Sequence, residues 1–105
     1  MFIAMNRFQV KLGQEEAFET VWKNRDSFLE DVPGFVSFHL LRGSAEEDHT
    51  LFATHTLWES RDAFVAWTKS EAFRKAHAGA GNNKPLYAGS PRLELFDTVQ
   101  SVTAS

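Results

Sequence analysis

The sequence predicts an α+β fold in which one antiparallel sheet carries its helices on a single face. Strand-like and helix-like segments follow one another in the order β-α-β-β-α-β, which is typical of the ferredoxin-like split β-α-β unit. The chain has 105 residues, enough for one hydrophobic core and too few for two. We therefore expect a single domain over residues 1–105.

The composition is that of a globular protein. Hydrophobic residues make up 43% of the chain, which argues against disorder. The net charge of −3 gives no electrostatic footprint for nucleic acid, and the lack of cysteine excludes disulfides and thiolate chemistry. No signal-peptide pattern opens the sequence, and no apolar stretch is long enough to span a membrane. We expect a cytoplasmic protein without nucleic-acid or membrane partners.

Alternation and helical spacing predict the first two elements. Residues 2–10 form a strand-like run, and one face of that strand would carry Phe2, Ala4, Asn6, Phe8 and Val10. Gly13 then breaks the pattern. Apolar residues recur near helical spacing over residues 14–31, after acidic residues at the start. Pro33 and Gly34 predict the end of that helix.

The second half of the chain predicts a hairpin, a bent helix and a last strand. Residues 35–43 and 49–58 are strand-like and are separated by the polar turn SAEEDH. Ser60 can cap a following helix, and Ser70 with Glu71 predicts a break within it. A Gly- and Asn-rich loop leads to RLELFDTV, residues 92–99, as the last clear strand.

The sheet face turned away from the helices is also expected to need a cover. We assign these apolar side chains to it: Ile3, Met5, Val36, Phe38 and Leu40. Monomeric proteins rarely leave a contiguous apolar face in water, and closed two-fold dimers are the commonest oligomers. The sequence therefore predicts a sheet-to-sheet homodimer.

Three residues stand in places where their type is unusual. Asn6 shares a strand face with apolar residues, and a buried amide costs about 1–3 kcal/mol unless it is hydrogen-bonded. It is either satisfied by backbone or directed into a ligand cavity. Trp67 is either core or a flat wall with one N–H donor. His77, at the helix end, is either a capping or exposed residue or a metal ligand.

The other histidines do not extend His77 into a zinc site. His39, His49 and His55 lie on the predicted hairpin, and their spacing fits no zinc motif. A lone histidine ligand among apolar walls suits an iron that a macrocycle already holds, as in heme. Each of these signals, taken singly, leaves packing or capping open as its explanation.

Taken together, these residues resemble a known family. Asn6, VPGFVSFHLLRG (32–43) and LWESRDAFVAWTKSEAFRKAH (57–77) are similar to the IsdG-type heme-degrading monooxygenases. These enzymes belong to the antibiotic-biosynthesis-monooxygenase superfamily of dimeric α+β barrels. The resemblance runs from about residue 1 to residue 77. It implies heme as both substrate and oxygen-activating cofactor, oxidative ring opening with O2 and an external electron donor, and release of iron. A reductase would then be a partner.

The resemblance also implies a role for each site residue. His77 would be the axial ligand of the heme iron, and Asn6 would donate a hydrogen bond on the distal side, toward iron-bound oxygen or the macrocycle. Trp67 would press the porphyrin out of plane, and Phe64 would line the same heme site. Two alternatives stay open: a cofactor-free quinol-type monooxygenase of the same superfamily, with no need of His77 as a ligand, and a non-enzymatic heme-binding dimer.

Overall fold

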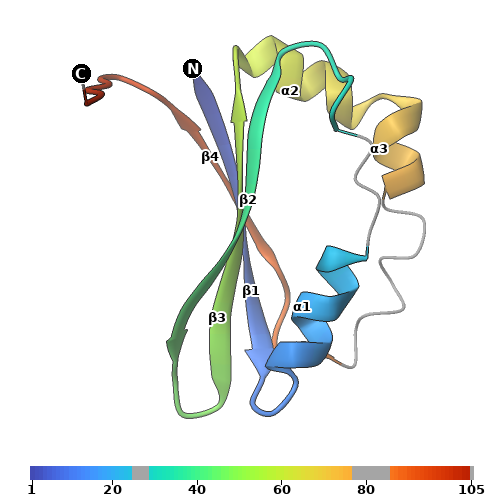
Figure 1. The fold of residues 1–105 in the computed structure, drawn as a ribbon, viewed down its shortest axis with the longest axis vertical. Helices are drawn as coiled ribbons and strands as arrows, with labels where there is room; N and C mark the ends of the chain where they lie inside the picture. Colours follow the sequence, from blue (N-terminus) through green and yellow to red (C-terminus); the bar gives the residue numbers. More distant parts are fainter. Residues whose placement is uncertain (25–28, 77–85, 105) are drawn as a thin grey trace.

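The computed structural model describes residues 1–24, 29–76 and 86–104. One antiparallel sheet, in the order β2-β3-β1-β4, contains β1 (Phe2–Lys11), β2 (Phe35–Ala45), β3 (His49–Trp58) and β4 (Arg92–Asp97). The helices are α1 (Glu15–Lys23), α2 (Arg61–Thr68) and α3 (Glu71–Ala76). All three lie on the same side of the sheet (Figure 1). The predicted fold class and element order are confirmed. No helix of the described residues is long and apolar enough to cross a membrane.

The helix-covered face of the sheet carries two separate clusters of buried side chains. The α2-side cluster contains Phe2, Ala4, Leu29, Trp58 and Phe64. The α1-side cluster contains Phe8, Val10, Phe18 and Phe52. Burying a side chain such as phenylalanine stabilises a fold by about 1.5–3 kcal/mol. The predicted inward face of β1 is therefore right, and Asn6 lies on that face between the two clusters.

Helix α1 is shorter than the sequence predicts. It ends at Lys23, and the backbone N–H of Asn24 caps it by donating to Thr20 O. Leu29 is buried in the α2-side cluster from a turn rather than from a helix, because Val32 N donates to Leu29 O at 3.0 Å. Pro33 also disfavours helical backbone at the residue before it. Phe28, predicted on the same helix, lies outside the described residues.

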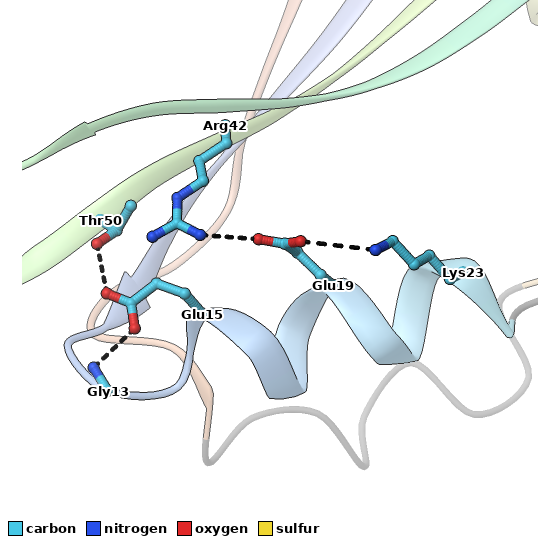
Figure 2. A network of polar contacts seen from close by, with 6 residues as sticks. All are labelled: Gly13, Glu15, Glu19, Lys23, Arg42 and Thr50. Carbon is cyan, nitrogen blue, oxygen red and sulfur yellow. Dashed lines mark hydrogen bonds and ion pairs between the residues drawn. The ribbon is translucent and has the colours of Figure 1, made fainter.

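A polar network ties α1 to the β2–β3 hairpin (Figure 2). The two oxygens of the Glu15 carboxylate accept hydrogen bonds from Thr50 Oγ1 at 2.7 Å and from Gly13 N at 2.8 Å. One turn later, Glu19 forms an ion pair with Arg42 at 3.0 Å and another with Lys23 at 3.8 Å. The N-terminal half of α1 is thus joined to both hairpin strands by side chains.

The sequence correctly predicts how the second helix begins and breaks. Ser60 Oγ accepts a hydrogen bond from Ala63 N at 3.1 Å at the start of α2. Ser70 Oγ accepts one from Phe73 N at 3.1 Å at the start of α3. Gly34 reaches α2 closely, with a φ of +83° and room for no side chain, because an added Cβ would lie 2.4 Å from the Cβ of Ala63.

Two residues predicted for the open face lie on the helix-covered face instead. Phe38 stacks on Trp22 of α1 with ring centroids 5.9 Å apart, and Leu40 packs against the α1-side cluster. The pairing of β2 with β3 shifts register between Phe35 and Ser37, and an extra residue at such a bulge turns the following side chains to the other face. The prediction is therefore wrong for Phe38 and Leu40. Ile3 and Met5 remain on the open face, since they alternate with buried residues of β1.

Candidate functional site

Asn6 lies near the middle of the helix-covered face, where the two clusters meet. Its direct neighbours across the sheet are Thr54 on β3 and Leu93 on β4. Its Oδ1 atom is buried, and no described residue donates a hydrogen bond to it. An acceptor in that state costs about 1–3 kcal/mol. Such a cost is typically tolerated where a ligand or water completes the hydrogen bond.

Trp67 is held by an aromatic box above the α2-side cluster. Its ring centroid lies 5.4 Å from that of Trp58, 6.1 Å from that of Phe64 and 4.8 Å from that of Phe73. The Phe73 ring meets it nearly edge-on, at 84°, an arrangement that aromatic pairs prefer. Three braces from three elements restrict the rotation of the indole, so the box gives one wall of the site a fixed shape.

Phe64 occupies the inner side of this box. Its side chain is only 7% exposed, and it also contacts Phe2, with ring centroids 5.5 Å apart. It therefore supports Trp67 from the core side. Its predicted contact with heme stays a prediction.

An uncovered apolar strip lies beside Asn6 on β4. Leu93 and Leu95 are 57% and 39% exposed, and they pair with Asn6 and Ala4 of β1. Directly opposite residues on neighbouring strands point to the same face, so both leucines lie on the helix-covered side of the sheet. One polar atom, a rigid aromatic wall and an apolar strip together suit a flat apolar ligand with a polar centre.

The structure places Asn6, Phe64 and Trp67 on one face of the sheet, and their predicted roles toward heme stay predictions. His77 follows Ala76, the last residue of α3, but it lies outside the described residues. Its role as an iron ligand therefore stays a prediction.

Sequence reasoning missed three neighbours of this site. Trp58 and Phe73 complete the box around Trp67, and Thr54, only 7% exposed, lies directly opposite Asn6. Phe73 lies within the segment 57–77 that carries the family resemblance, so the sequence held a signal for it. Thr54 gave no comparable signal, because its position opposite Asn6 depends on the register of two distant strands.

Comparison with known proteins places the chain in a family. The family described as antibiotic biosynthesis monooxygenase matches residues 1–79. The chain belongs to this family.

Within this family, two similar proteins are named for heme degradation. A heme oxygenase (mycobilin-producing) of Mycobacterium tuberculosis is 36% identical over 100 residues, covering 95% of this chain and 90% of that protein. A heme-degrading monooxygenase of Shouchella clausii is 32% identical over 101 residues, covering 92% and 89%. The resemblance to heme-degrading monooxygenases is confirmed.

Solved structures agree on the fold. The heme-degrader MhuD from Mycobacterium tuberculosis, with two hemes bound in its active site, gives a TM-score of 0.73 at 30% identity, covering 98% of this chain and 100% of that one. SnoaB, a cofactor-independent oxygenase from Streptomyces nogalater, gives a TM-score of 0.69 at 24% identity, covering 98% and 97%. The second likeness concerns the fold alone, and one fold serves several chemistries.

Proposed function

We propose that this chain is a heme-degrading monooxygenase. It binds heme as its substrate on the helix-covered face, opens the porphyrin ring with O2 and electrons from an external donor, and releases the iron. The observation that carries the proposal is the buried, unsatisfied Oδ1 of Asn6 on the same face of the sheet as the braced Trp67. The two relatives that are 32–36% identical and are named for heme degradation support it.

The described residues fit such a ligand. Heme is a flat apolar plate, and sites for such molecules combine apolar walls with a few directed polar groups. Trp67 would supply the wall, Leu93 the apolar floor and Asn6 the polar group. His77 would supply a neutral imidazole to the iron, a common protein ligand of heme iron. Phe64 would hold Trp67 against the ligand from the core side.

The protein's part in the reaction is to bind, orient and shape. When bound, heme supplies the iron at which O2 is activated, and its own ring is the part that is oxidised. The amide of Asn6 has one acceptor, Oδ1, and one donor group, Nδ2, and rotation about its last side-chain bond would turn the Nδ2–H donor toward the oxygen substrate, which can only accept. The aromatic box would keep Trp67 from moving aside when the porphyrin binds, so Trp67 would press on the bound ring. Electrons would come from a separate reductase.

Hemin titration of the purified ligand-free chain tests the proposal. We expect a Soret band that saturates at a stoichiometric amount of hemin and then bleaches when reductant and air are added, with iron appearing on a chelator. A stable band would instead indicate a heme-binding dimer without chemistry. No band would contradict the proposal and favour the cofactor-free quinol-type monooxygenase.

Two single variants test whether His77 is the ligand of the heme iron. His77→Ala should abolish bleaching and change both ferric and ferrous spectra, because the imidazole is lost while the apolar walls remain. His49→Ala, on the hairpin, is the matched control and should keep the parent spectra. Unchanged spectra in His77→Ala would contradict the assignment of His77 as the axial ligand.

We also propose that the open face of the sheet joins two copies of the chain. Its apolar residues include Ile3, Met5 and Leu57, with Leu41 at 41% and Phe96 at 44% exposure. Sedimentation should give a dimer at micromolar concentration, and Phe96→Glu should weaken it. Leu12→Glu, in the turn before α1, is a control that should not. A monomeric parent chain would contradict the proposal.

A further inference from the structure

Trp58 is the last residue of β3, and its side chain is 0% exposed. Since β3 lies between β1 and β2 in the sheet, Trp58 is paired on both sides, with Phe2 of β1 and with Phe35 of β2. The side chain belongs to the α2-side cluster on the helix-covered face. A residue enclosed in this way presents no surface to a ligand, so any effect that it has on one must pass through a neighbour.

The described neighbours of the Trp58 ring are aromatic, and one of them is Trp67. Phe35 and Phe64 meet Trp58 nearly edge-on, with ring centroids 5.7 and 5.9 Å away and planes at 72° and 73°. Trp67 lies closer, at 5.4 Å, and its plane is tilted by only 36° from that of Trp58. The two indoles therefore lie more nearly face to face than the two phenylalanine pairs. Through this contact the sheet limits the tilt of Trp67.

Of the three described rings that contact Trp67, Trp58 is the one that belongs to the sheet. Phe64 lies on α2, as Trp67 does, so a shift of that helix carries both rings together. Phe73 lies on the short helix α3 and is half-buried. Trp58 is tied to a strand on either side, so it is the fixed support against which Trp67 can be held.

The indole N–H of Trp58 does not explain why a tryptophan stands here. Its Nε1 atom is buried, and no described residue accepts a hydrogen bond from it. A buried donor in that state costs about 1–3 kcal/mol, and a phenylalanine ring would fill part of the same space without that cost. What tryptophan supplies and phenylalanine does not is the larger two-ring surface against its aromatic neighbours.

We propose, on the basis of the proposed function, that Trp58 is a positioning residue for heme degradation. By supporting Trp67 from the sheet, it fixes how far Trp67 presses on the bound porphyrin, and hence how strongly the porphyrin is bent out of plane. A smaller ring at residue 58 would leave a gap in a close-packed interior, and Trp67 would sink toward the sheet when the porphyrin binds. The porphyrin would then bind in a flatter form and be oxidised more slowly.

Trp58→Phe in the full, ligand-free chain tests the contact itself. The indole N–H resonance of Trp67 in a proton–nitrogen correlation spectrum should shift and broaden, because the ring loses its support. Phe18→Leu is the matched control, since it also shrinks a fully buried aromatic side chain, but in the α1-side cluster. It should leave the Trp67 resonance in place. An unchanged Trp67 resonance in Trp58→Phe would contradict the supporting role.

Hemin binding by the same variants separates positioning from packing. Trp58→Phe should bind hemin within about threefold of the parent affinity and bleach bound heme at least about tenfold more slowly. The out-of-plane bands of bound ferric heme in the resonance Raman spectrum should weaken. Phe18→Leu should lower the midpoint of thermal unfolding without changing those bands. Benzothienylalanine at residue 58, which keeps two fused rings and lacks the N–H, should restore the parent bands and bleaching rate.

Thermal unfolding of the ligand-free variants checks that they fold, and Trp58→Tyr, which leaves a smaller gap, carries the same measurements if Trp58→Phe does not. Parent-like Raman bands and bleaching in the folded Trp58 variant would overturn this inference, while bleaching by the parent chain would leave the proposed function intact. A parent chain that binds no hemin would overturn the proposed function and this inference with it.

Discussion

The two helical ends of the molecule cover the same face of the sheet in different ways. At the α1 end, Glu15 and Glu19 join the helix to Thr50 and Arg42 of the hairpin, and Phe18 is 1% exposed. At the α2–α3 end, the hydrogen bonds of Ser60 and Ser70 and the ion pair of Arg74 with Glu71 are local to the helices, and Arg61 lies 5.5 Å from the centre of the Phe2 ring. Contact with the sheet there is largely aromatic.

The two ends therefore have different roles. The α1 end fixes its helix to the sheet, whereas the α2–α3 end leaves surface on which a ligand can bind. At the α1 end, the buried aromatic residues and the carboxylates of Glu15 and Glu19 all contact partners within the protein. At the α2–α3 end Trp67 and Phe73 stay half-buried, and Asn6, on the same face of the sheet, has an unsatisfied buried acceptor. Apolar surface and a polar atom that are left incomplete in the free protein are what a ligand can complete.

The largest expected effect is a loss of stability at the α1 end of the molecule. Phe18→Ala should lower the free energy of unfolding by about 3–5 kcal/mol, as for other buried phenylalanines, because it empties the contacts with Phe8 and Phe52. Hemin affinity of the folded fraction should stay close to that of the parent. Urea denaturation and hemin titration measure the two quantities.

Phe73→Ala is the matched change at the other end. It removes the edge-on brace of Trp67, so we expect a smaller loss of unfolding free energy and a larger loss of hemin affinity than for Phe18→Ala. Phe18→Leu retains most of the volume and keeps the comparison possible if Phe18→Ala does not fold. Equal effects of the two alanine variants on hemin affinity would show that the ends do not differ in this way.

A smaller effect on stability, of opposite sign, is expected at Asn6. Asn6→Leu removes the buried unsatisfied acceptor, so the ligand-free chain should unfold with a free energy unchanged or higher by about 1–3 kcal/mol. Bleaching of bound heme should nevertheless be lost. Chemical denaturation followed by single-turnover bleaching would detect this trade between stability and function.

Asn6→Ala separates binding from chemistry. One hydrogen bond is worth about 0.5–1.5 kcal/mol, so hemin affinity should fall at most about tenfold. The oxidation rate should fall further, because an interaction made mainly in the transition state appears in turnover. Gln9→Ala, exposed on the other face of β1, is the control. If Asn6→Ala bleached heme at the parent rate, Asn6 would have no role in the oxidation step and would only pack in the site.

The smallest expected effect concerns how the stability of the α1 end changes at acid pH. The hydrogen bond from Thr50 lowers the pKa of Glu15 below its ordinary value of 4.5, helped by the backbone N–H at Gly13. A carboxyl whose pKa is lowered by folding stabilises the protein above that ordinary value, and the contribution is lost as the pH falls through the folded pKa. Thr50→Val should therefore reduce the dependence of unfolding free energy on pH in the acid range.

Denaturation at several pH values below about 5 measures this slope. Thr50→Val should add nothing to a Glu15→Gln background, since both changes act through one carboxyl. If the pH slope of Thr50→Val stayed at the parent value, the hydrogen bond from Thr50 would not be what couples the Glu15 carboxyl to stability.

Much of the fold and part of the site could be predicted from local patterns. The alternation of β1 places Phe2, Phe8 and Asn6 on one face without knowledge of any partner strand. Ser60 and Ser70 predict the helix starts because capping involves atoms only three residues apart. Asn6 and Trp67 were found because their residue types conflict with an ordinary apolar stripe, and such a conflict is visible in one sequence.

The sequence by itself determined the order of the elements, the inward face of β1 and the two helix caps, since each depends on spacing within a few residues. Tertiary structure decided the face of Phe38 and the neighbours of Asn6. It also placed His39 beside His55. These features depend on the β2–β3 register and on contacts between residues more than ten positions apart. One inserted residue at a bulge reverses which side chains meet, and the local periodicity of the sequence does not record it.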